Sequence, residues 1–67
     1  MNAHYAGTIT EPMPTSLFEA ELYSVAKRWH KRSVEEISAM CNRMGCTPGQ
    51  RANAIRAYMA ERQRHED

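Results

Sequence analysis

Apolar side chains recur at helical spacing in the stretch from Ser16 to Lys31. They are Phe18, Leu22, Val25 and Trp29. Positions three, four and seven residues apart share one side of an α-helix, so the pattern predicts a helix over residues 16–31 whose apolar face packs on a core. Ser16 and Glu19 have the spacing of a capping box, which is a signal for a helix start.

A second apolar stripe predicts a helix over residues 34–44. Its members are Val34, Ile37, Met40, Cys41 and Met44. Ser33 and Glu36 repeat the capping-box spacing at its start. Gly45 is the residue type expected just after a helix, because glycine enters the left-handed conformation without steric cost. Since Ser33 is nearly the whole connection, the first two helices should meet at a sharp corner.

The third predicted helix covers residues 48–63 and begins with a clear start signal. Thr47 at the N-cap, Pro48 in the first turn and Gln50 three residues after the cap all favour a helix here. Helical spacing then predicts an inward face made of Ala52, Ile55 and Met59, with Tyr58 at its edge.

These segments predict an all-α fold, with a compact three-helix domain over residues 16–67 and an arm over residues 1–15. Pro12 and Pro14 keep the end of the arm extended and prevent a helix before Thr15. We expect a flexible arm; the alternative is an arm that orders on a partner or in a DNA minor groove.

The composition is that of a globular protein, because 42% of the 67 residues are apolar and 25% are charged. No apolar run approaches the roughly 20 residues of a membrane span. The N-terminus has neither the basic residues nor the apolar stretch of a secretory signal. We therefore expect a cytoplasmic protein with no membrane partner, whose cysteines, Cys41 and Cys46, stay reduced.

Charge is unevenly distributed, although the net charge is only +1. All nine lysines and arginines lie between residues 27 and 64, where only Glu35, Glu36 and Glu61 oppose them. A basic cluster surrounds Trp29 and consists of Lys27, Arg28, His30, Lys31 and Arg32. Such a cluster is either a solvated helix end that suits the helix dipole or a set of phosphate contacts.

Known catalytic and metal-binding patterns are missing from the sequence. It has no glycine-rich phosphate loop and no nucleophile elbow, and a three-helix chain of this length has little room for a pocket. Cys41, Cys46, His30 and His65 are zinc-ligand types, but they lack zinc-finger spacing. We expect no enzymatic activity, no cofactor, no metal and no small-molecule substrate.

The stretch from Met44 to Tyr58, MGCTPGQRANAIRAY, resembles the turn and second helix of a helix-turn-helix motif, with Gly45 as the turn glycine. Met40, Met44 and Cys46 then fill apolar positions of the motif, Cys41 fills the small-residue position, and the turn is similar to that of sigma-factor-like DNA readers. The motif has a buried Val or Ile where this chain has Arg51. Either the third helix is rotated relative to the usual docking, or the helix pair is only a corner.

The resemblance implies a small DNA-binding regulatory or accessory protein. We expect a homodimer, because one such domain offers little contact area for specific binding. In this interpretation Gln50, Asn53 and Ala57 contact base edges. The phosphate contacts come from the basic side chains Lys27, Arg28, Lys31, Arg32, Arg51 and Arg56.

The same face of the third helix favours a second interpretation, a helical adaptor or inhibitor that binds another protein or itself. Small side chains let another helix approach closely, so the expected interface is Ala54, Ala57 and Ala60. Tyr23 and Tyr58 are its expected exposed anchors. Both interpretations require this face to be open to solvent.

Overall fold

The described part of the chain consists mainly of three helices, α1 (Leu17–Arg28), α2 (Val34–Met44) and α3 (Pro48–His65). The structure is a computed structural model, and it describes residues 9–66. Within that range there is no strand, which confirms the all-α, three-helix prediction. None of these helices is long and apolar enough to cross a membrane. Residues 1–8 of the predicted arm lie outside the described part.

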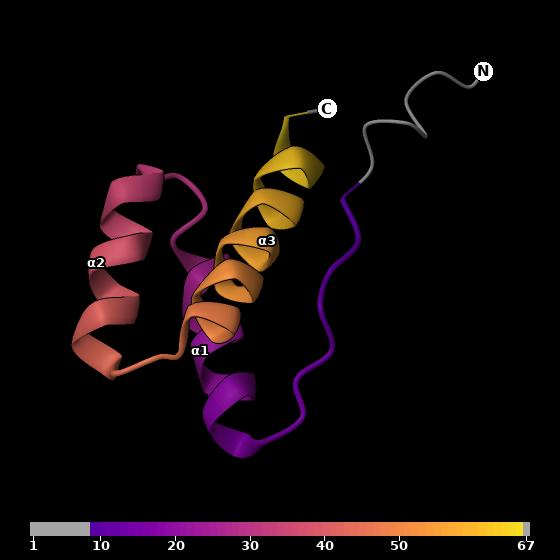
Figure 1. Cartoon of the computed structure of the whole chain (residues 1–67). Helices are drawn as coiled ribbons and strands as arrows, with labels where there is room; N and C mark the ends of the chain where they lie inside the picture. The colour runs from indigo at the N-terminus through magenta and orange to yellow at the C-terminus, as the bar shows by residue number, and fades with distance from the viewer. Residues whose placement is uncertain (1–8, 67) are drawn as a thin grey trace.

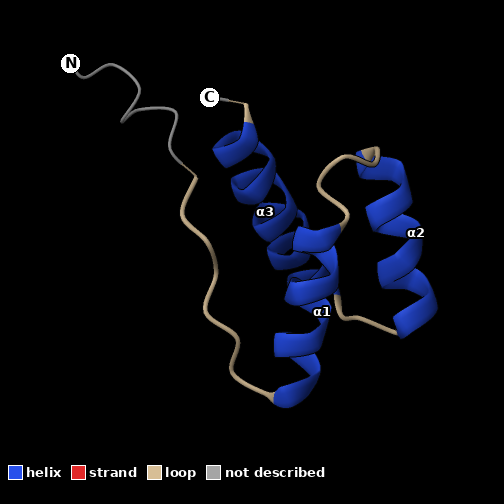
Figure 2. Ribbon diagram, turned by 180° about the vertical axis from the view of Figure 1, so that it is seen from behind, coloured by secondary structure: helices blue, strands red, loops and turns tan. Residues whose placement is uncertain are grey.

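The first and last helices form the centre of the fold. α1 and α3 run in the same general direction, and α2 runs the opposite way beside them (Figure 1). The view from behind places α1 in front of α3, with α2 to one side (Figure 2). Contact is more extensive between α1 and α3 than between α2 and α3.

Local capping explains where the helices begin. Thr47 and Gln50 form a complete capping box at α3, with N–H donations of 3.0 and 3.1 Å, and Ser33 and Glu36 do the same at α2. At α1 the Ser16 hydroxyl accepts from the N–H of Glu19 as predicted. The Glu19 carboxylate, however, accepts from the backbone N–H of Thr15 at 2.9 Å rather than from that of Ser16.

α1 ends at Arg28, three residues earlier than the sequence predicts. The next residues, 29–33, turn tightly, since the N–H of Arg32 donates to the carbonyl of Trp29 at 2.9 Å. The hydroxyl of Tyr58 on α3 donates to the carbonyl of Arg32. A tertiary hydrogen bond therefore stabilises a turn in place of the last predicted part of the helix.

The core takes side chains from all three helices. Its buried members are Leu22, Tyr23, Ala26, Ile37, Met40, Cys41, Ala54, Ala57 and Tyr58. The predicted stripe of α2 includes all three of its buried core residues, whereas the predicted stripe of α1 includes only Leu22, with Val25 and Trp29 partly buried against the core. Phe18 and Val34 were also predicted to be inward, but their side chains lie at the edge and are 38% and 39% exposed.

The predicted inward face of α3 is wrong. Ala52 is exposed, Ile55 is half-buried and Met59 is 44% exposed. The buried face consists instead of Ala54, Ala57, Tyr58 and Ala60. Alanines let the backbones of α1 and α3 approach closely, and Tyr58 fills the remaining volume. The bulkier Met59 has no place in so narrow an interface and lies at the surface.

Candidate functional site

The residues expected to read DNA bases are not gathered on an open face. Ala57 is completely buried, and Asn53 is half-buried. The amide of Gln50 donates to the carboxylate of Glu19 on α1 at 3.1 Å. The outward orientation expected for Ala57 and Gln50 is therefore wrong, because α3 packs on α1 at these positions.

The surface expected for a helical partner is covered in the same way. Ala54 is fully buried, and Ala60 is 6% exposed. Tyr23 and Tyr58, expected to be exposed anchors, are 3% and 1% exposed. Their aromatic rings complete the core, and the partner of the alanine face is α1 of the same chain.

The basic residues expected to contact phosphates are dispersed. Arg51 donates to Asn42 in the last turn of α2 at 3.1 Å, whereas Lys31 and Arg32 precede the first turn of α2. α2 has 11 residues, so about 16 Å of helix separates these two groups. Arg56 is exposed, five residues beyond Arg51 and therefore roughly 140° further around α3.

The remaining members of the basic cluster have partners within the chain. Lys27 pairs with Glu11 at 2.5 Å, and Arg28 donates to the hydroxyl of Ser24 at 3.3 Å. The guanidinium of Arg32 lies over the ring of Trp29, 4.1 Å from its centroid. This cation–π contact holds Arg32 at the corner between α1 and α2.

A groove lies beside this corner, between the start of α2 and the C-terminal half of α3. We call it the corner groove, and its principal lining residues are Lys31, Arg32, Val34, Met59, Arg62 and Glu66. Its volume is about 700 Å³, within the range of ligand-binding clefts. Ile9 and Gln63 lie at the same groove, where the N–H of Ile9 donates to the Gln63 side chain at 3.0 Å.

The corner groove is lined by both apolar and cationic side chains. Its apolar members Val34 and Met59 are 39% and 44% exposed. Its lining includes three cations and one carboxylate, that of Glu66, which lies 3.7 Å from Nε of Arg62. Arg62 also donates to the hydroxyl of Tyr58 at 2.6 Å, so its guanidinium is oriented although its side chain is 49% exposed.

A pair of stacked histidines adjoins the corner groove. The rings of His30 and His65 lie 4.2 Å apart and are nearly parallel, at 5°. They line a smaller cavity of about 290 Å³ that shares Lys31, Arg62 and Glu66 with the corner groove. This stacking joins the end of α1 to the last turn of α3.

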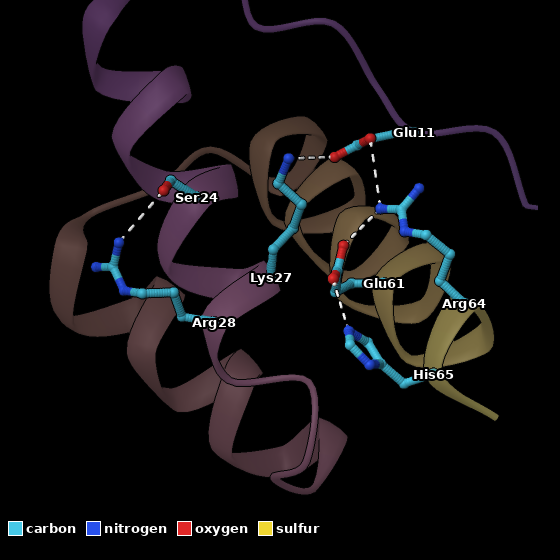
Figure 3. A network of polar contacts seen from close by, with 7 residues as sticks. All are labelled: Glu11, Ser24, Lys27, Arg28, Glu61, Arg64 and His65. Atoms are coloured by element: carbon cyan, nitrogen blue, oxygen red, sulfur yellow. Dashed lines mark hydrogen bonds and ion pairs between the residues drawn. The ribbon is translucent and has the colours of Figure 1, made fainter.

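Glu61 links His65, one member of the histidine pair, to a polar network (Figure 3). Its carboxylate contacts Arg64 at 2.5 Å and Nε2 of His65 at 2.9 Å. The hydrogen bonds from Arg64 and then from His65 lower the pKa of Glu61 below its ordinary value. Arg64 also faces Glu11 at 3.8 Å, so the network connects the segment before α1 with the end of α3.

The histidines and cysteines, which are zinc-ligand types, lie in two separate places. Within residues 9–66, no group of three or more histidine, cysteine, aspartate or glutamate side chains is arranged to hold a metal ion. His30 and His65 lie together beyond the start of α2, while Cys41 and Cys46 lie at its other end.

Sequence reasoning missed the corner groove. It assigned Val34 and Met59 to the core and gave Arg62 no role. The spacing of apolar residues along one helix does not reveal that these three side chains, from two helices, lie around one groove. That Met59 is exposed can be recognised only once the buried face of α3 is known.

Comparisons with known proteins gave no match to a family model, to a curated protein or to a solved structure.

Proposed function

We propose that this chain is a small helical adaptor whose corner groove binds an acidic segment of a partner protein that carries a bulky apolar side chain. The observation that carries the proposal is the exposure of Val34 and Met59 among Lys31, Arg32 and Arg62. Water contact with apolar side chains costs free energy, and burial by a partner recovers about 25 cal/mol per Å² of apolar area.

Charge complementarity favours an acidic occupant. The carboxylates of a peptide would pair with the guanidiniums of Arg32 and Arg62, whose orientations are already fixed by Trp29 and Tyr58. Preorganised cations lose less conformational entropy on binding than mobile ones. An apolar side chain of the peptide would contact Met59 and Val34.

The groove favours a peptide over duplex DNA. Phosphates would use its cations but would gain nothing from its apolar side chains. The arginines expected for a DNA-reading corner, Arg51 and Arg56, are not among its lining residues. Of the side chains expected to read bases, Ala57 is buried and Gln50 donates to Glu19 of α1.

The test is a peptide-display selection on the full chain, followed by affinity measurements on the selected peptides. We expect sequences rich in glutamate and aspartate with an aromatic or aliphatic residue, and affinity that falls as salt rises. Met59→Glu and Arg62→Glu should each weaken binding by about tenfold or more. Ala52→Glu, on the same helix at an exposed position outside the groove, is the matched control.

Selected peptides that bind Met59→Glu as tightly as the unsubstituted chain would contradict the proposal. Mixed-sequence duplex DNA that displaces the peptide and perturbs the NMR signals of Val34 and Met59 would assign the groove to nucleic acid instead.

A further inference from the structure

The two cysteines lie together at the turn that ends α2. Gly45 has a φ of 75°, and this left-handed residue reverses the chain direction. The N–H of Cys46 then donates to the carbonyl of Cys41 at 3.2 Å, and the N–H of Gly45 donates to that of Asn42 at 3.2 Å. This pair of bonds is a Schellman motif, in which the residue after the turn folds back onto the last turn of the helix.

The backbone hydrogen bond limits how far apart the two cysteines can lie. Fixed covalent geometry limits the reach from a carbonyl oxygen to its own Cα and from an N–H to its own Cα. With 3.2 Å between the nitrogen of Cys46 and the oxygen of Cys41, their Cα atoms are at most about 7 Å apart. Disulfides join cysteines whose Cα atoms are about 4.4–6.8 Å apart, so this upper limit lies at the far end of the disulfide range, and any bend at the hydrogen bond brings the two Cα atoms closer.

The thiols themselves are in contact but differ in exposure. Cys41 is completely buried, whereas Cys46 is partly exposed and packs against the core from outside. Burial, followed by the proximity of the Cys46 thiol and its hydrogen bond, raises the pKa of Cys41 to about 11. The nearby Arg51 guanidinium acts in the opposite direction. Attack from solution therefore falls on Cys46, and Cys41 is protected until its neighbour has reacted.

We propose that Cys41 and Cys46 form a reversible dithiol–disulfide site that reacts with low-molecular-weight disulfides, with Cys46 as the entering thiol and Cys41 as the resolving thiol. The site lies at the end of α2 opposite to the corner groove, so it does not depend on the proposed function.

The reaction balances as two thiol–disulfide exchanges. The Cys46 thiol loses its proton, its sulfur attacks one sulfur of oxidised glutathione, and one glutathione thiolate leaves. The Cys41 thiol then loses its proton and attacks Sγ of Cys46, which expels the second glutathione thiolate. The two glutathione thiolates take up the two protons. Two protein thiols are oxidised, and one glutathione disulfide is reduced to two thiols.

The experiment is mass spectrometry of the full, folded chain during incubation with oxidised glutathione. We expect the unsubstituted chain to lose two hydrogens with little glutathione adduct, because the adjacent Cys41 resolves the mixed disulfide rapidly. Cys41→Ala should accumulate one glutathione adduct at Cys46. Cys46→Ala should react at least about tenfold more slowly, since its remaining thiol is buried. Circular dichroism checks that each variant is helical.

A measurement on the unsubstituted chain alone removes any dependence on how the variants fold. In a glutathione redox buffer, the ratio of internal disulfide to mixed disulfide should be at least about tenfold higher for the folded chain than for the chain in urea, because the turn holds the thiols together. An equal or lower ratio in the folded chain would overturn the proposal. So would a folded chain that stops at the glutathione adduct or forms only disulfide-linked dimers.

Discussion

Gln50 and Glu19 join the N-terminal turns of α3 and α1. The amide of Gln50 donates to one carboxylate oxygen of Glu19 at 3.1 Å, while its carbonyl accepts the backbone N–H of Thr47 at 3.0 Å. The other oxygen of Glu19 accepts from the N–H and the hydroxyl of Thr15. Gln50 therefore caps α3 and also binds the glutamate that accepts hydrogen bonds at the start of α1.

Acid should weaken this junction. The hydrogen bonds from the Thr15 backbone, from Gln50 and from the Thr15 hydroxyl lower the pKa of Glu19 below its ordinary value of 4.5. A lowered folded-state pKa means that the contribution to stability is complete above about pH 4.5 and is lost as the pH falls through the folded value. Glu61, with its lowered pKa, should act in the same direction.

Glu19→Gln isolates the Glu19 contribution. The variant should unfold at a lower temperature than the unsubstituted chain at neutral pH, and the two melting temperatures should converge in acid, where Glu19 is protonated. Thermal melts followed by circular dichroism over a pH series measure this. A difference in melting temperature between the two chains that stays unchanged in acid would contradict this role of the Glu19 carboxylate.

Ala57 and Ala52 form a matched pair on α3. Ala57 is fully buried against α1, and Ala52 is exposed. Ala57→Leu should overpack the interface and cost about 1–3 kcal/mol, whereas Ala52→Leu should change stability by less than about 0.5 kcal/mol. Urea titrations of both variants measure the difference. The opposite order would restore the face that the sequence predicts.

Removing the hydroxyl from the two buried tyrosines should change the stability of the fold in opposite directions. The Tyr23 hydroxyl is buried and has no hydrogen-bond partner among residues 9–66, so Tyr23→Phe removes an unpaid desolvation cost and should stabilise the fold. The Tyr58 hydroxyl binds both Arg32 and Arg62, so Tyr58→Phe should cost about 0.5–1.5 kcal/mol.

Differential melting temperatures distinguish the two tyrosine variants, since about 1 kcal/mol moves the midpoint by roughly 4–8 °C in a domain of this size. A destabilised Tyr23→Phe variant would mean that its hydroxyl has a partner in solution.

Two glycines give a third matched pair. Gly45 has a φ of 75°, so Gly45→Ala forces a side chain into the left-handed region and should cost about 1–2 kcal/mol. Gly49 lies in the first turn of α3, where an added Cβ would meet only the Thr47 hydroxyl at 4.0 Å. Gly49→Ala should therefore stabilise the fold, by up to about 1 kcal/mol. Chemical denaturation of both variants tests this, and a destabilised Gly49→Ala chain would be the contrary result.

Features with local causes could be predicted from the sequence. The capping boxes at Ser33 and Thr47 and the left-handed Gly45 depend on residues within one turn, and the structure has them where the spacing predicts. The end of α1 could not be predicted, because it depends on a hydrogen bond from Tyr58, 26 residues beyond Arg32.

The prediction of which face of α3 is buried was wrong for a different reason. Its apolar residues are distributed around the helix, and alanine is compatible with either a buried or an exposed position. The size of Met59 suggested a core position, but α1 offers a close backbone contact that only small residues permit. The corner groove depends on the same orientation of α3, so it could not be predicted from the sequence either.

The dominance of the α1–α3 contact also affects how this chain can fold during its synthesis. A ribosome releases α1 before α3, so the helix with which α1 has its most extensive contact is synthesised after it. While α3 is still being made, Leu22 and Tyr23 cannot be covered as they are in the folded chain. The packing of α1 therefore waits for the synthesis of the helix that, of the three, lies farthest from it in the sequence.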